Sequence, residues 1–170
     1  MLEAVVSAGY ATLLAVGYPA LFTVFVLKGA IIGKPLPTSV FLPGYVLAVS
    51  PSWRTVLASV LVASLGYTIG QLLVYLLAAR VGVDGVRSLP GVRLSDEQVE
   101  RSNRLFRRYG GIGIVVTNLV PYVGSFALIP AGLTSYPFGR AAVYAFLSTL
   151  LNYALVIWFV TGTVGLVVGT

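Results

Sequence analysis

Five uncharged stretches follow one another along the chain, separated by isolated charges and by one long charged linker. They cover residues 4–27, 35–53, 55–79, 110–139 and 141–170. A helix needs about 20 apolar residues to cross the hydrocarbon core of a membrane. Three of the stretches reach this length with Pro19 as their only proline. The pattern therefore predicts membrane-spanning helices over residues 4–32, 55–79 and 141–168.

The other two stretches, residues 35–53 and 110–139, are interrupted by prolines and glycines. The interruptions that we expect at hairpin tips are Pro43, Gly44, Pro121, Gly124 and Pro130. Non-helical backbone is tolerated at membrane depth only where protein or water surrounds it. We therefore predict a re-entrant hairpin over each stretch. For 110–139, a kinked but ordinary spanning helix stays open as an alternative.

The linker, residues 80–109, holds seven arginines and four acidic residues. The basic residues of the linker and Arg140 outnumber Lys28, Lys34 and Arg54 by eight to three. Because cytoplasmic loops carry the excess of basic residues, the linker and the N-terminus are expected in the cytoplasm and the C-terminus outside. Acidic residues are interleaved with the arginines, so contact with anionic lipid headgroups explains the segment better than binding of nucleic acid.

An amphipathic surface helix is predicted within the linker, over residues 95–109. Ser95 and Gln98 have the spacing of a capping box at its start. Glu100 and Arg104 have the i, i+4 spacing of an ion pair.

Composition supports a membrane protein and limits its chemistry. Hydrophobic residues make up 58% of the chain and charged residues 9%, too few charges to cover a water-soluble domain. Glu3 precedes the first long apolar stretch, which fits a retained anchor better than a cleaved signal peptide. The chain has neither cysteine nor histidine. We therefore expect no enzyme, no catalytic residue, no metal site and no cofactor.

The two halves of the chain share a layout. Arg54 follows Pro43 by eleven residues in the first half, and Arg140 follows Pro130 by ten in the second. A single predicted crossing separates the halves, so they would be inverted relative to each other. The expected fold class is an all-α polytopic membrane protein. It would contain an inverted repeat of re-entrant hairpin plus spanning helix, an N-terminal spanning helix and a cytoplasmic amphipathic helix.

Short motifs across roughly residues 20–165 carry a family resemblance. They are Phe41-Leu42-Pro43-Gly44, Ser64-Leu65-Gly66-Tyr67, Phe106-Arg107-Arg108-Tyr109-Gly110 and Ile129-Pro130-Ala131-Gly132-Leu133. In this order and spacing they resemble the DedA family, also called the VTT or SNARE-associated Golgi protein family. The resemblance implies two opposed re-entrant hairpins. It also implies lipid movement between leaflets, by a flippase or scramblase acting on phospholipids or polyprenyl-phosphate lipids.

The chain departs from the family pattern at its charged positions. The family often has acidic residues near the places of Lys28 and Tyr45, and arginines at the places of Asn118 and Gly124. All five acidic residues of this chain lie near the N-terminus or in the linker. A cycle that protonates a membrane-embedded acid is therefore not supported.

Polar and basic residues of the predicted membrane segments are the candidates for binding a lipid headgroup. They are Asn118, Arg54, Arg140, Ser125, Gln71, Asn152, Lys28 and Lys34. Arg54 and Arg140 have the alternative role of interfacial anchors. Gln71 and Asn152 have the alternative role of hydrogen bonding between helices. Asn118 lies three residues before a hairpin proline, where its amide needs a polar partner.

We thus expect a multi-pass lipid transporter of the cell membrane that is not proton-coupled. Membrane lipids are its expected partners, and the sequence leaves a homo-oligomer open. The alternative is a non-transporting membrane scaffold that has lost the polar site of its family.

Overall fold

The computed structural model describes residues 15–30, 38–49, 52–88, 95–119 and 128–168. Every regular element in these ranges is a helix, which confirms the all-α prediction for this part of the chain. The helices are α2 (Tyr18–Gly29), α3 (Thr38–Ala48), α4 (Trp53–Arg87), α5 (Asp96–Tyr109), α6 (Ile112–Leu119), α7 (Leu128–Leu133) and α8 (Phe138–Val168).

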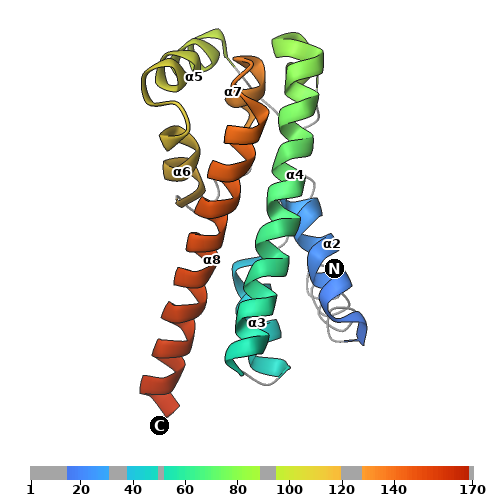
Figure 1. Ribbon diagram of the computed structural model, residues 1–170, viewed down its shortest axis with the longest axis vertical. Helices are drawn as coiled ribbons and strands as arrows, with labels where there is room; N and C mark the ends of the chain where they lie inside the picture. The colour runs from blue at the N-terminus through green and yellow to red at the C-terminus, as the bar shows by residue number, and fades with distance from the viewer. Residues whose placement is uncertain (1–14, 31–37, 50–51, 89–94, 120–127, 169–170) are drawn as a thin grey trace.

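Two long helices, α4 and α8, form the axis of the molecule. They pack against each other and run in opposite directions (Figure 1). Both are long and apolar enough to cross a membrane, over Trp53–Arg87 and Phe138–Gly162. Their outward faces are lined with exposed leucines and other large apolar side chains, the surface expected of helices that contact lipid.

Short helices pack against this pair from opposite ends (Figure 1). Helix α3 lies beside the half of α4 that begins at Trp53, and it contacts both long helices. At the other end, α6 packs on α8 and α7 packs on α4. Helix α5 lies at that same end, in contact with α6 and α7.

Helix α2 crosses α4 at a set of glycines. A Cβ atom added at Gly70 would collide with the backbone carbonyl of Val26, and one added at Gly66 with that of Phe22. A Cβ at Gly29 would collide with the carbonyl of Tyr67. Small residues spaced in this way let two helix backbones approach closely, and they recur where membrane helices cross.

The helix expected over residues 4–32 differs from the structure in the part that the structure describes. Helix α2 begins at Tyr18, after Gly17 with a φ of 73°, and ends at Gly29. A positive φ is accessible to glycine but not to a helical residue, and Pro19 suits a helix start because it lacks an N–H. Its 12 residues fall short of a crossing. Residues 4–14 and 31–32 lie outside the described residues.

Two of the three prolines predicted at hairpin tips, Pro43 and Pro130, lie within helices. Pro43 is buried inside α3, where it removes one backbone hydrogen bond and its ring crowds the carbonyl four residues before it. Pro130 is the third residue of α7, a position whose N–H would have no helical partner in any case. Gly44 also lies within α3. Pro121 and Gly124 lie outside the described residues.

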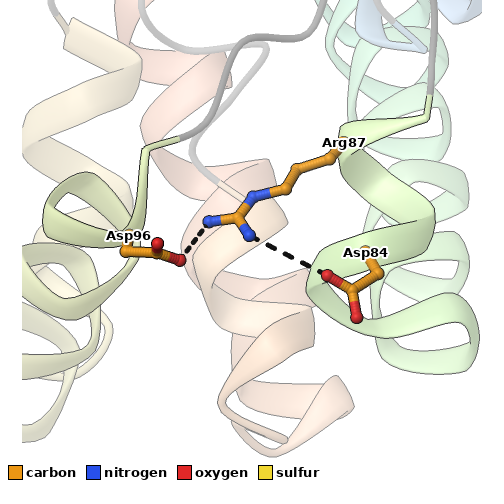
Figure 2. A network of polar contacts seen from close by, with 3 residues as sticks. All are labelled: Asp84, Arg87 and Asp96. Carbon is orange, nitrogen blue, oxygen red and sulfur yellow. Dashed lines mark hydrogen bonds and ion pairs between the residues drawn. The ribbon is translucent and has the colours of Figure 1, made fainter.

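The last turns of α4 are tied to α5 by an exposed ionic network. At Gly82 a φ of 66° and ψ of −167° interrupt the helical path, so the segment that follows takes a new direction. Figure 2 shows the Arg87 guanidinium between two carboxylates, Asp84 of α4 and Asp96 of α5. The network joins two helices whose connecting residues, 89–94, the structure does not describe.

Helix α5 lies where the sequence predicts an amphipathic helix. It begins directly after Ser95, whose carbonyl accepts from the Val99 N–H at 3.1 Å. The predicted pair of Glu100 and Arg104 is confirmed, with the guanidinium nitrogen 3.0 Å from the carboxylate oxygen.

Candidate functional site

A buried chain of hydrogen bonds links α4, α6 and α8. The Gln71 Nε2 donates to the Asn118 Oδ1 at 2.7 Å. The Asn118 Nδ2 in turn donates to the Ser148 Oγ at 2.8 Å, and the Thr149 Oγ1 lies 3.5 Å from the same nitrogen. These four side chains are buried. Buried amides constrain how the three helices are placed, because each donor or acceptor left without a partner costs free energy.

Asn152 completes this group by bonding to backbone. Its Nδ2 donates to the carbonyl oxygen of Asn118 at 2.7 Å. Helix α6 ends at Leu119, so the Asn118 carbonyl lies in the last turn and has no partner within its own helix. The Asn152 side chain supplies the missing donor. We call Gln71, Asn118, Ser148, Thr149 and Asn152 the amide cluster.

The amide cluster lies near the middle of both long helices. Gln71 is the 19th of 35 residues in α4, and Asn152 the 15th of 31 in α8. At a rise of 1.5 Å per residue, each lies about 21–27 Å from either end of its helix. A membrane crossed by these helices would therefore have its hydrocarbon core at the cluster.

Beside the amide cluster, three aromatic rings surround a lysine. The Lys28 Nζ lies 5.6 Å from the ring centroid of Phe25, 5.3 Å from that of Tyr67 and 5.5 Å from that of Tyr153. The rings come from α2, α4 and α8, and we call them the aromatic cage. Tyr67 precedes Gln71 by one helical turn, and Tyr153 follows Asn152 directly, which places the cage next to the amide cluster.

Several buried hydroxyls lie in the same region. Among the described residues, Ser64 and Thr68 of α4 and Tyr153 of α8 have hydroxyl groups that are buried and have no hydrogen-bond partner. Each is at least nine-tenths buried. Buried polar groups are normally hydrogen-bonded, so hydroxyls without protein partners indicate a place where another polar group can bind.

The structure brings together four of the eight residues predicted to bind a headgroup: Gln71, Asn118, Asn152 and, beside them, Lys28. It does not bring in Arg54 or Arg140. Both are exposed in the first turns of α4 and α8, about 25 Å before Gln71 and about 18 Å before Asn152 along the helix axes. The Arg54 guanidinium lies 5.6 Å from the Trp53 ring centroid. Ser125 and Lys34 lie outside the described residues.

Sequence reasoning missed Ser148, Thr149 and the aromatic cage. A signal for the hydroxyls existed, since they precede Asn152 by four and three residues and therefore share its helix face. The cage had no such signal, because its rings come from helices far apart in the sequence.

The donor set limits what the site can do. It contains an ammonium, amides and hydroxyls, all of which can donate hydrogen bonds to an oxyanion. Within the described ranges, no three Asp or Glu residues gather in a way that could hold a metal ion. Such donors can bind a polar group that bears a phosphate.

Comparisons with known proteins identify the family of the chain. The family model of the VTT domain matches residues 11–162. The chain is also 23% identical to the uncharacterized protein MJ0201 of Methanocaldococcus jannaschii over 124 residues, which cover 73% of this chain and 72% of that protein. No solved structure matches the chain. Because the family match covers most of its length, the chain belongs to the VTT domain family of membrane proteins, the family that its DedA-like motifs predict.

Proposed function

We propose that this protein moves lipids between the two leaflets of the cell membrane, as a flippase or scramblase for phospholipids or polyprenyl-phosphate lipids. The observation that carries the proposal is the amide cluster at mid-length of α4 and α8. Polar groups are expensive at this depth of a membrane, and those that occur there commonly mark the path of a polar substrate.

The arrangement of the helices supports passage of a headgroup. Short helices approach the middle of the molecule from both ends, α3 from one and α6 with α7 from the other (Figure 1). In a membrane they would be opposed re-entrant hairpins in inverted halves, and a lipid headgroup would pass along the cluster while its tails stay in the hydrocarbon. Lys28 supplies positive charge for the headgroup phosphate at the same depth.

The positions of the carboxylates support transport without proton coupling. In the part of the chain that the structure describes, the acidic residues are Asp84, Asp96, Glu97 and Glu100, all in the last turns of α4 or in α5. None lies near the amide cluster, so no carboxylate there can carry a proton across the membrane. Lipid would equilibrate passively or follow its own gradient. Chemical conversion of the lipid is not part of the proposed role.

The same distribution of charge supports a topology. The arginines of α5 and Arg140, in the first turn of α8, lie at one end of the molecule (Figure 1). By the positive-inside rule this end, with the linker 80–109, faces the cytoplasm in a multi-pass arrangement.

The test is reconstitution in liposomes that contain lipids with fluorescent headgroups. A quencher added outside reports how fast inner-leaflet lipid becomes accessible. Transport predicts faster quenching of the inner pool than in protein-free vesicles for at least one headgroup. Equal rates for every headgroup would exclude the proposal.

One observation favours a second function, a membrane scaffold. Both ends of the Asn118 side-chain amide already have protein partners, as in a purely structural cluster. Alanine variants of Asn118, Arg54 and Arg140 separate the two functions. A scaffold that remains folded should tolerate all three changes with its partner assembly intact, whereas a transporter should lose lipid movement with Asn118→Ala.

A further inference from the structure

The aromatic cage has the composition of a binding site for an ammonium ion. A cation over the face of an aromatic ring is attracted by the electrons of that face, and proteins recognise ammonium ligands with several rings around one cation. Here three rings lie at nearly the same distance from one nitrogen, between 5.3 and 5.6 Å. The present occupant belongs to the chain itself, as the side chain of Lys28.

The rings hold one another in place. The centroid of Tyr153 lies 5.2 Å from that of Phe25 and 5.9 Å from that of Tyr67, both in edge-to-face contact. The helices that carry Phe25 and Tyr67 cross tightly at Gly66 and Gly70. The fold therefore forms the cage. The group that it holds, the Lys28 side chain, ends in a primary ammonium.

We propose that the aromatic cage binds the primary ammonium of an ethanolamine-type phospholipid headgroup, which replaces the Lys28 ammonium while Lys28 pairs with the headgroup phosphate. This inference rests on the proposed lipid transport and names its substrate class. The exchange leaves each charge with a partner: the rings face one ammonium, and the lysine faces the phosphate. A headgroup with phosphate but no ammonium would draw Lys28 away and leave the cage empty.

The buried hydroxyls support the phosphate side of this site. The Tyr153 hydroxyl belongs to a ring of the cage, and Thr68 is the neighbour of Tyr67 on α4. Together with Ser64 they are donors without protein partners in the described part of the chain. Phosphate oxygens accept several hydrogen bonds at once, so buried hydroxyls on the helices that carry the cage can serve a phosphate beside the Lys28 ammonium.

Binding of soluble headgroups tests the inference without any transport. Purified protein in detergent is titrated with glycerophosphoethanolamine and with glycerophosphoglycerol in a calorimeter. The wild type should bind the ethanolamine compound about threefold to thirtyfold more tightly, the range expected for a cation among aromatic rings. Equal affinities, or preference for the glycerol compound, would overturn the inference.

Two variants assign the preference to the cage. Tyr153→Leu removes one ring, so the ratio of the two affinities should fall toward one. Trp158→Leu, the same kind of change at an exposed position of α8, should leave the ratio as in the wild type. The ratio is taken within one folded sample, so a general loss of stability does not imitate the effect. An unchanged ratio in Tyr153→Leu contradicts the cage.

Lys28→Met removes the internal occupant and leaves the rings in place. Ethanolamine itself, which has no phosphate, should bind this variant more tightly than the wild type. Equal or weaker binding would mean that Lys28 does not compete for the cage and only holds α2 against α4 and α8.

Liposomes with fluorescent phosphatidylethanolamine and phosphatidylglycerol then separate this inference from the proposed function. Faster movement of the ethanolamine lipid supports both. Movement without a headgroup preference contradicts the cage as the lipid site and leaves transport standing. A preference for the soluble headgroup without movement of any lipid contradicts transport and retains the ammonium site.

Discussion

Gln71 and Asn118 lie 47 residues apart in the chain, and their side-chain amides are joined by a hydrogen bond of 2.7 Å. The bond fixes the end of α6 against the middle of α4. Because Asn118 also bonds to Ser148 of α8, one side chain holds three helices at the same level. The Asn118 side chain therefore contributes to the stability of the amide cluster and to its polarity.

Asn118→Leu should destabilise the protein and abolish lipid movement. The change removes the Asn118 side-chain hydrogen bonds to Gln71 and Ser148, and one intramolecular hydrogen bond contributes about 0.5–1.5 kcal/mol to stability. Thermal unfolding in detergent measures the loss of stability, and the liposome assay measures the loss of transport.

Thr117→Val is the matched control for Asn118→Leu. Thr117 neighbours Asn118 on α6, but its hydroxyl bonds only to carbonyls of its own helix, those of Gly113 and Ile114. Transport should therefore persist in this variant. If Thr117→Val and Asn118→Leu impair transport equally, the amide cluster has no specific role.

Gly70→Ala should weaken the crossing of α2 and α4. The new methyl group would collide with the Val26 carbonyl, and overpacking of a close contact costs about 1–3 kcal/mol. Gly162→Ala meets no atom within 4 Å, so the better helix propensity of alanine should stabilise α8 by up to about 1 kcal/mol. Unfolding temperatures in one detergent compare the two variants. A stable Gly70→Ala protein would contradict the tight crossing.

Arg87→Gln should loosen the junction of α4 and α5 with little effect on global stability. The Arg87 ion pairs with Asp84 and Asp96 are exposed, and such pairs contribute less than about 1 kcal/mol (Figure 2). Limited proteolysis between the two helices should become faster in the variant, and high salt should produce a similar change in the wild type. Identical proteolysis rates at low salt would show that the network does not hold the junction.

Tyr75→Phe should cost about 1 kcal/mol of stability. The Tyr75 hydroxyl donates to the carbonyl of Tyr136, in the turn between α7 and α8. Without this donor the turn loses a hydrogen bond to α4. Chemical unfolding of the purified protein measures the difference, and stability equal to that of the wild type would argue against the bond.

The family, the helical class and the amides of the site could be predicted from the sequence, because each leaves a local signal in it. Gln71, Asn118 and Asn152 are conspicuous in stretches that otherwise hold few strong polar groups. Ser148 and Thr149 are less conspicuous, since hydroxyls in membrane helices often bond to their own backbone, as Ser148 also does here.

Two other expectations depended on geometry that the sequence does not encode locally. Pro43 was expected at a tip, but α3 continues through it, although a proline inside a helix removes one hydrogen bond and crowds the carbonyl four residues before it. Arg54 and Arg140 were expected to share the site with Asn118. Their distance from it follows from continuous helix, which separates Arg54 from Gln71 by 17 residues and Arg140 from Asn152 by 12.

The most direct test of lipid movement through the amide cluster compares the wild type with Asn118→Leu and Thr117→Val in the liposome assay. We expect lipid to reach the outer leaflet faster with the wild type and Thr117→Val than in protein-free vesicles. Asn118→Leu, reconstituted in folded form, should return the rate to the protein-free value. Transport by folded Asn118→Leu at the wild-type rate would contradict a role for the amide cluster in lipid movement.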